Sequence, residues 1–336
     1  MRARRYSHIC TGTGWGLECC GSHVWYRSRV AAIRPSNCES RFLWWWLHSQ
    51  LGSLASVATG STYAAVTADD LGSLQFPLIR VEEQRRIADF LDVETARIDG
   101  LVTLRRRMRG LLGLKRERVI ERALGLEGQF VTDKIVPLAY LCREVVVGIV
   151  ITPAVWYVEG GGVPALRGLN IRPGRVDKTE MVMISHEGHA IHRKSALAAG
   201  DIVVVRTGMA GAAAVVPPEL NGANCIDLVI VRPRSDLHPR FIEYVLNSPY
   251  ARRRVDEYSV GSIQAHFNVG AMKKMPIPYI PASDQWRIVE WLDRETGKFD
   301  ELMTRIDSQE KLLEERRRAL ITAAVTGQFD VTAARA

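Results

Sequence analysis

Two stretches of the chain share one pattern of apolar and polar positions. Residues 86–99 read RIADFLDVETARID and residues 287–300 read RIVEWLDRETGKFD, so the second stretch begins 201 residues after the first. The segments ahead of them are also alike, because SRFLWWWLHS at 40–49 resembles PRFIEYVLNS at 239–248. A repeat at nearly constant offset predicts a unit that the chain uses twice, and each unit is a globular segment followed by a helix.

The period inside each copy is that of a helix that packs along another helix. Between Gln84 and Ala123 the chain has no proline, which allows a continuous helix of about 40 residues. An apolar residue recurs every seven positions, with only Arg105 interrupting the series, and this heptad predicts a coiled coil between the two copies. The expected interface residues are Leu91, Ile98, Leu112, Val119, Leu292, Phe299, Ile306, Leu313 and Leu320.

The two predicted helices differ in charge. Residues 83–125 hold 11 Lys or Arg against 7 Asp or Glu, whereas residues 284–326 hold 8 against 10. Opposite net charge favours packing of the two helices within one chain. In an antiparallel arrangement we expect Arg105–Arg107 to lie near Asp307, although solvated faces of this kind contribute little to stability.

Composition narrows the class of protein. A length of 336 residues, 47% hydrophobic and 24% charged, is that of a folded protein with about two domains. The net charge of +8 favours a polyanionic partner such as nucleic acid. The six cysteines form no CxxC pair, and no apolar run approaches the roughly 20 residues that cross a bilayer. We therefore expect a cytoplasmic protein with reduced thiols and no membrane partner.

The repeated motif resembles that of a known family. EEQRRIADFLDVETARIDGLV, SDQWRIVEWLDRETGKFDELM and the tail RRALITAAVTGQFDV look like the specificity subunit of type I restriction–modification enzymes. That resemblance implies a mixed α/β (α+β) fold, with two target recognition domains joined by two long helices in an antiparallel coiled coil. It also implies a non-catalytic subunit that binds double-stranded DNA at a bipartite site and docks the methylation and restriction subunits. The chain itself would carry no cofactor, and ATP, magnesium and S-adenosylmethionine would be used by the partner subunits.

The domain bounds follow from the repeat. We expect a first recognition domain at 1–80, a first spacer helix at 81–130, a second recognition domain at 131–280, a second spacer helix at 281–330 and a tail at 331–336. The first domain looks truncated, because about 65 residues corresponding to 135–200 have no counterpart before the first helix. We therefore expect the truncation to affect DNA reading by the first domain, and not DNA reading by the second.

Candidate DNA contacts come from the chemistry of polar residues in the second domain. The segment LRGLNIRPGRVDK at 166–178 combines cations with an asparagine beside a Pro–Gly turn, and arginine can pair with guanine and asparagine with adenine. In HEGHAIHRK at 186–194 the histidine spacing is a poor chelate, so a polar DNA-facing loop is favoured over a metal site. GSIQAHFN at 261–268 alternates polar and apolar residues. The candidate contacts are Arg167, Asn170, Arg172, Arg175, Lys178, Arg193, Lys194, Ser262, Gln264, His266 and Asn268.

Two other functions remain open at this point. We find no nucleotide-binding loop, no nuclease carboxylate pair and no methyltransferase motif in the sequence. The first alternative is a partner-docking scaffold, or a half-functional subunit, whose first domain has lost DNA reading. The second alternative is a stand-alone DNA-binding regulator, which would bind a specific sequence without partner subunits.

Overall fold

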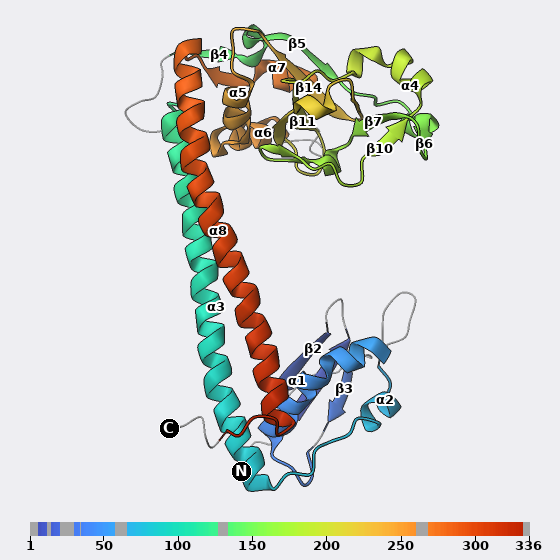
Figure 1. The fold of residues 1–336 in the computed structure, drawn as a ribbon, viewed down its shortest axis with the longest axis vertical. Coiled ribbons are helices and arrows are strands. Elements are labelled where there is room, and N and C mark those ends of the chain that lie inside the picture. Colours follow the sequence, from blue (N-terminus) through green and yellow to red (C-terminus); the bar gives the residue numbers. More distant parts are fainter. Residues whose placement is uncertain are drawn as a thin grey trace. The chain divides into compact units, whose positions relative to one another are not determined.

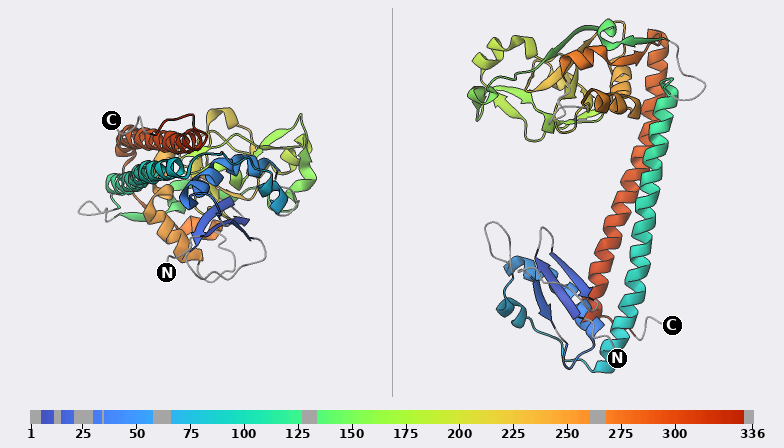
Figure 2. Two further views of the ribbon diagram at one scale, coloured as in Figure 1. Left: turned by 90° about the horizontal axis from the view of Figure 1, so that it is seen from below. Right: turned by 180° about the vertical axis from the view of Figure 1, so that it is seen from behind.

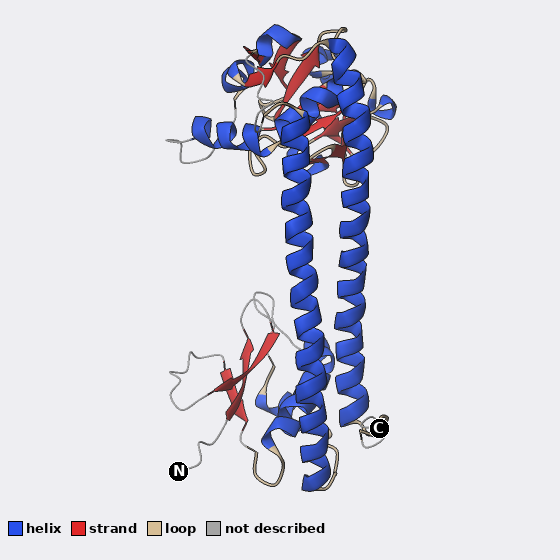
Figure 3. Ribbon diagram, turned by 90° about the vertical axis from the view of Figure 1, so that its left-hand side faces the viewer, coloured by secondary structure: helices blue, strands red, loops and turns tan. Residues whose placement is uncertain are grey.

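The chain folds into two compact units of mixed helix and strand. The computed structural model describes residues 6–11, 15–20, 30–33, 35–57, 66–126, 134–259 and 268–331. Unit 1 comprises residues 1–109 and 303–336, and unit 2 comprises residues 110–302. Helices and strands occur in both units (Figure 3). The expected mixed α/β class is confirmed.

Two long helices pass from one unit to the other. Helix α3 (Val81–Ala123) and helix α8 (Ala282–Val325) lie against each other (Figure 1). In unit 1 Arg109 pairs with Asp307, and in unit 2 Arg116 pairs with Asp300. The two helices are antiparallel, because a higher number on α3 pairs with a lower number on α8. The expectation of two long helices that pack together is confirmed.

The predicted interface positions turn inward to different degrees. Leu91, Ile98, Leu292 and Ile306 are buried, and Leu112, Val119, Phe299, Leu313 and Leu320 are half-buried. The interruption at Arg105 has a visible effect, since this side chain lines a shallow pocket in unit 1 with Leu101, Leu312 and Leu313. A guanidinium at a heptad position leaves apolar neighbours partly exposed.

Unit 1 joins a small sheet to a tryptophan-rich helix. Strands β1 (Tyr6–Thr11), β2 (Trp15–Cys20) and β3 (Val30–Ile33) form an antiparallel sheet in the order β2-β1-β3, and helices α1 (Ser40–Val57) and α2 (Ala68–Gly72) follow. Thr67 and Asp70 close a capping box at the start of α2. Trp45 and Trp46 are buried in a core with residues of α3 and α8.

Unit 2 contains two four-stranded sheets. The first has the antiparallel order β12-β11-β14-β5, from Ala213–Val215, Ile202–Val205, Leu228–Pro233 and Cys142–Val147. The second has the order β13-β7-β10-β6, from Asn224–Cys225, Val163–Leu166, Val182–Ile184 and Tyr157–Val158, with β13 parallel to β7. Two short pairs join β4 (Ile135–Pro137) to β15 (Pro276–Pro278) and β8 (Ile171–Arg172) to β9 (Arg175–Val176).

Helices α5 (Pro239–Asn247), α6 (Pro249–Ser259) and α7 (Val269–Lys274) share one core with the first sheet and with residues of the long helices (Figure 2). Helix α4 (His186–Ile191) lies apart from that core, beside the second sheet (Figure 1). In unit 2, 3₁₀ turns occur at Leu138–Leu141, Pro153–Trp156, Gly168–Asn170, Arg193–Ser195 and Pro218–Leu220. Strand β11 is buried on both faces. Ile202 and Val204 join the core that contains α5, while Val203 and Val205 join a second core on the opposite face.

Within the residues that the structure describes, no helix is both long enough and apolar enough to cross a membrane.

The buried heptad residues of the long helices, which we call the seam, include Leu292 and Ile306 on α8 and give a first prediction. Leu292→Ala removes a fully buried side chain that packs against α5 and α7, and we expect it to lower the free energy of unfolding by about 2–4 kcal/mol. Leu312→Ala is the matched control, because the Leu312 side chain is 63% exposed and its truncation leaves no cavity. Urea unfolding followed by circular dichroism measures both, and an equal loss in the two variants would contradict the assignment of the seam.

Candidate nucleic-acid interface

Residues 171–176 of the predicted basic segment at 166–178 form the β8–β9 hairpin. Its turn is Pro173-Gly174, and Gly174 has φ +77°, a left-handed conformation that glycine adopts without strain. Arg172 and Arg175 face each other across the hairpin. The pKa of the Asp177 carboxyl is lowered, first by hydrogen bonds from the Thr179 hydroxyl and backbone and then by these two arginines. The hairpin therefore presents two cations close together.

Asn170 has a different role from the one expected. Its side chain is 1% exposed, its Oδ1 accepts from the Arg167 backbone N–H at 2.9 Å, and its Nδ2 donates to the carbonyls of Asp177 and Thr179. A buried amide with these partners cannot reach a base edge while the loop is folded. Asn170 therefore closes the loop from inside, and we exclude it from the proposed DNA contacts.

Two further cations of this segment are held by protein groups. Arg167 is half-buried, and its Nη2 donates to the Glu180 carbonyl at 3.0 Å. Lys178 pairs with Glu219 at 2.8 Å, with both side chains 53% exposed. An exposed pair of this kind is weak and can be exchanged for a phosphate. Arg167 mainly supports the loop, whereas Lys178 stays accessible.

Arg193 and Lys194 lie in an exposed 3₁₀ turn. The backbone around them is fixed, because Arg232 Nη2 donates to the carbonyls of Lys194 and Ala196 at 2.9 and 2.8 Å. Among the described residues, the structure gives the two exposed side chains no hydrogen bond or ion pair. Arg193 and Lys194 are therefore exposed cations on a turn whose backbone is held by Arg232, which we call the braced turn.

The three histidines of the neighbouring segment do not converge. His189 Nδ1 lies 3.3 Å from Asn224 Nδ2, and the His192 ring packs edge-on against Trp156 at 5.8 Å between ring centroids. Gly188 permits this packing, since an added Cβ would lie 2.8 Å from the Trp156 ring. In the described part of the chain, no group of three or more His, Cys, Asp or Glu side chains is placed to hold a metal.

The last candidate segment is described only at its end. Ser262, Gln264 and His266 lie outside the described residues. Asn268 caps the start of α7, and its Oδ1 accepts from the Ala271 backbone N–H at 2.9 Å. The Asn268 oxygen is therefore occupied by its own helix, although the side chain is exposed.

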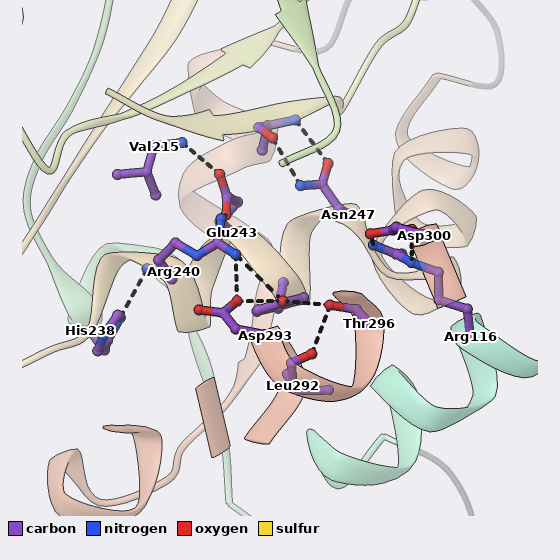
Figure 4. A network of polar contacts seen from close by, with 12 residues as sticks. Arg116, Val215, His238, Arg240, Glu243, Asn247, Leu292, Asp293, Thr296 and Asp300 are labelled. Atoms are coloured by element: carbon purple, nitrogen blue, oxygen red, sulfur yellow. Dashed lines mark hydrogen bonds and ion pairs between the residues drawn. The ribbon is translucent and has the colours of Figure 1, made fainter. Parts of the chain in front are cut away.

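A polar network anchors the domain part of unit 2 to α8 (Figure 4). Arg240 of α5 pairs with Asp293 of α8, and the Tyr244 hydroxyl donates to the same carboxylate at 2.6 Å. Thr296 Oγ1 donates to the Leu292 carbonyl at 2.7 Å and lies 3.1 Å from the Tyr244 hydroxyl. Burial, and then the contact with Asp293, raises the pKa of Tyr244 to about 12, so the hydroxyl stays protonated as a donor.

The same arginine connects α8 to the sheet. Glu243 is 3% exposed, and its carboxylate accepts from Arg240 Nη1 at 2.8 Å and from the Val215 backbone N–H of β12 at 2.7 Å. Burial raises the pKa of Glu243, and the Arg240 guanidinium opposes that rise. Helix α5 is thereby fastened on one side to α8 and on the other to the sheet.

A buried glutamine completes the anchor. Gln285 Oε1 accepts from the His238 backbone N–H at 3.0 Å, and its Nε2 donates to the Ile280 carbonyl at 2.8 Å. This side chain, 2% exposed, satisfies backbone groups at the starts of both α5 and α8. The two helices thus begin at a fixed separation.

Unit 1 contains the same anchor. Gln84 Oε1 accepts from the Glu39 backbone N–H at 2.8 Å, and its Nε2 donates to the Ile79 carbonyl at 2.8 Å. Arg41 pairs with Asp92 at 2.8 Å, and the Trp45 indole N–H donates to that carboxylate at 2.9 Å. The Trp45 indole N–H thus makes the hydrogen bond that the Tyr244 hydroxyl makes in the second copy.

The sequence contained the signal for this anchor, but its role was missed. Gln84 and Asp92 recur as Gln285 and Asp293, and polar identities inside an apolar heptad pattern are typical of buried hydrogen bonds. The exchange of Trp45 for Tyr244 obscures the third partner, because the two side chains share only a donor group. The repeated motif is thus explained as an attachment of each domain to its helix.

Comparison with known proteins finds similar chains. The family model described as "Type I restriction modification DNA specificity domain" matches residues 18–101, which include α1, α2 and the start of α3. The chain is 25% identical over 180 residues to the type I restriction enzyme StySPI specificity subunit of Salmonella potsdam, covering 51% of this chain and 37% of that protein. It is 24% identical over 185 residues to the type I restriction enzyme EcoKI specificity subunit of Escherichia coli (strain K12), covering 52% and 38%.

A solved structure shares the fold. It is described as "Structural basis underlying complex assembly and conformational transition of the type I R-M system", with a TM-score of 0.74 at 20% identity over 97% of this chain and 82% of that one. The chain matches less than two fifths of the length of the two curated relatives. These matches show that the chain is similar to specificity subunits of type I restriction enzymes, and that residues 18–101 resemble the specificity domain of that family.

Proposed function

We propose that the chain is a non-catalytic DNA specificity subunit that directs methylation and restriction subunits to a bipartite DNA site. The observation that carries this proposal is the duplicated anchor, with Gln84 and Asp92 in unit 1 and Gln285 and Asp293 in unit 2. Two domains fixed in the same way to one antiparallel helix pair suit the reading of two half-sites at a set spacing. The curated relatives are themselves named as specificity subunits of type I restriction enzymes.

In this proposal each unit contributes one target recognition domain, and α3 and α8 form the coiled-coil spacer. The domains are residues 1–80 and 131–280, the spacer helices 81–130 and 281–330, and residues 331–336 a tail. ATP, magnesium and S-adenosylmethionine would serve the partner subunits, and the complex would act in the cytoplasm. The chain's own contribution is binding and orientation.

The proposed DNA-facing residues of unit 2 are those whose cations remain accessible. Arg172 and Arg175 lie on the hairpin, Lys178 follows it, and Arg193 and Lys194 lie on the braced turn. Ser262, Gln264 and His266 remain candidates from the sequence. Exposed guanidinium and ammonium groups of this kind hold phosphates and make binding dependent on salt.

A partner-docking scaffold is the second candidate function. One observation favours it: the anchor of unit 1 is complete, whereas among the described residues the sheet of unit 1 has three strands and unit 2 has two four-stranded sheets. The spacer would then recruit the methylation subunits while the second domain alone reads DNA. Methylation mapping separates the two functions, since a bipartite motif requires two reading domains and a scaffold yields half a motif or none.

The braced turn gives a prediction about DNA affinity. For Arg193→Gln/Lys194→Gln we expect weaker binding to duplex DNA and a salt dependence reduced by about two in the slope of log K against log salt, because two phosphate contacts are lost. Fluorescence anisotropy across a salt series measures both quantities. Lys298→Gln on α8 is the control, and a slope unchanged from the parent protein would remove the turn from the interface.

The anchor gives a prediction that combines stability and specificity. Tyr244→Phe deletes the hydroxyl that donates to Asp293, and we expect the free energy of unfolding to fall by about 1–2 kcal/mol. Discrimination between specific and non-specific DNA should decline while the salt slope stays the same, because Tyr244 holds the domain and touches no phosphate. Tyr140→Phe, at a side chain that is 71% exposed, is the matched control. A changed salt slope in Tyr244→Phe would contradict the anchoring role.

A further inference from the structure

Besides Arg106–Glu314 at 3.2 Å, which is offset by four residues, four ion pairs join the two long helices in one register. They are Asp99–Arg317 at 3.0 Å, Arg106–Glu310 at 2.6 Å and Arg109–Asp307 at 2.6 Å in unit 1, and Arg116–Asp300 at 2.9 Å in unit 2. The residue numbers of the two partners add up to the same total in every pair. An antiparallel pairing without a register shift has this property.

The outer two pairs are copies of each other. The repeat offset of 201 residues carries Asp99 onto Asp300 and Arg116 onto Arg317. Each helix therefore holds the same aspartate and the same arginine at these positions. In the same register, two copies of α3, or two copies of α8, would form these pairs equally well.

The inner two pairs differ between the copies. The same offset carries Arg106 onto Asp307 and Arg109 onto Glu310, so both signs are inverted. If α3 met a second α3 in this register, Arg106 of one copy would face Arg109 of the other. If α8 met a second α8, Asp307 would face Glu310. Pairing of α3 with α8 makes four attractive contacts, whereas pairing of like helices makes two attractive and two repulsive contacts.

We infer that the inner charges of α3 and α8 select the partner helix, so that each long helix accepts the other repeat and rejects a second copy of itself. The seam supports this inference, because Arg105 on α3 occupies the repeat position of the buried Ile306 on α8. Two copies of α3 would bring two such arginines into one apolar seam. Charges flanking a heptad seam determine partner choice in this way in other helix pairs.

The inner pairs affect the choice of the partner helix more than they affect the stability of the fold. Arg106 is 62% exposed and Glu310 18%, while Arg109 is 52% exposed and Asp307 44%, and an attraction at such exposure contributes little to folding. The choice between partners depends on the difference between attraction and repulsion, which is larger than either contribution alone. The surface thus fits a helix of opposite central charge, supplied by the other repeat of this chain.

Arg109→Asp/Asp307→Arg tests the inference without weakening the fold. This exchange keeps the composition and keeps both inner pairs attractive within the chain, but opposite charges would also face each other between like helices. We expect an unchanged thermal transition and an increase in self-association of at least about tenfold, from four contacts reversed by a few tenths of a kcal/mol or more each. Sedimentation equilibrium of the full chain at low salt measures the association.

Arg109→Glu/Glu310→Arg is a second test, which reverses the charges within the chain. Here both inner contacts within the chain become repulsive, while those between like helices become attractive. We expect a lower thermal transition together with stronger self-association than in the first exchange, and both effects should shrink at high salt, which screens exposed charges. The full inversion Arg106→Glu/Arg109→Glu/Asp307→Arg/Glu310→Arg, with Glu314→Arg added because Glu314 also pairs with Arg106, should restore the behaviour of the parent chain in both measurements.

Arg107→Glu/Glu315→Arg is the matched control, because it exchanges the same residue types on the same helices away from the four pairs. The inference is overturned if the first exchange associates no more than this control. It is also overturned if the second exchange loses stability without gaining association, since the inner pairs would then stabilise the helices without choosing between partners.

Discussion

The attachment of a short helix to a long one through a shared carboxylate is the interaction on which the rest of the structure depends. In unit 2 Asp293 receives Arg240 and Tyr244 together, and in unit 1 Asp92 receives Arg41 and Trp45. A carboxylate with two directional donors fixes orientation as well as proximity. The apolar cores beside these carboxylates, which contain Phe241 in unit 2 and Phe42 in unit 1, bury apolar surface against the long helices. Apolar contacts are not directional, so they fix the orientation of the short helix less strictly.

The sequence predicted the long helices and missed the detail of the domains for physical reasons. A heptad repeated over some forty residues is a strong periodic signal, so α3 and α8 were foreseen in existence and pairing. The sheets of unit 2 consist of strands such as Asn224–Cys225 and Val182–Ile184, which are too short to show alternation. Asn170 was misplaced because amide chemistry is the same at a base edge and inside a loop, and only burial separates the two.

The repeat holds two kinds of information. Residues identical in both copies, such as Gln84 with Gln285, do the same work twice, namely attaching a domain to its helix. Residues that change sign between copies, Arg106 with Asp307 above all, make the two halves complementary. The two long helices of a duplicated chain thereby pair with each other within one molecule.

Arg232 holds the backbone of the turn that carries two of the proposed DNA contacts. Its guanidinium holds the carbonyls of Lys194 and Ala196 and pairs with Asp201 and Glu144 on separate strands or turns. The turn that carries Arg193 and Lys194 is therefore ordered by folding itself, and less backbone entropy remains to be lost when a polyanion binds. In the proposed DNA interface, preorganisation of this kind would show mainly in the dissociation rate, so loosening Arg232 would shorten the lifetime of the complex without removing a contact to DNA.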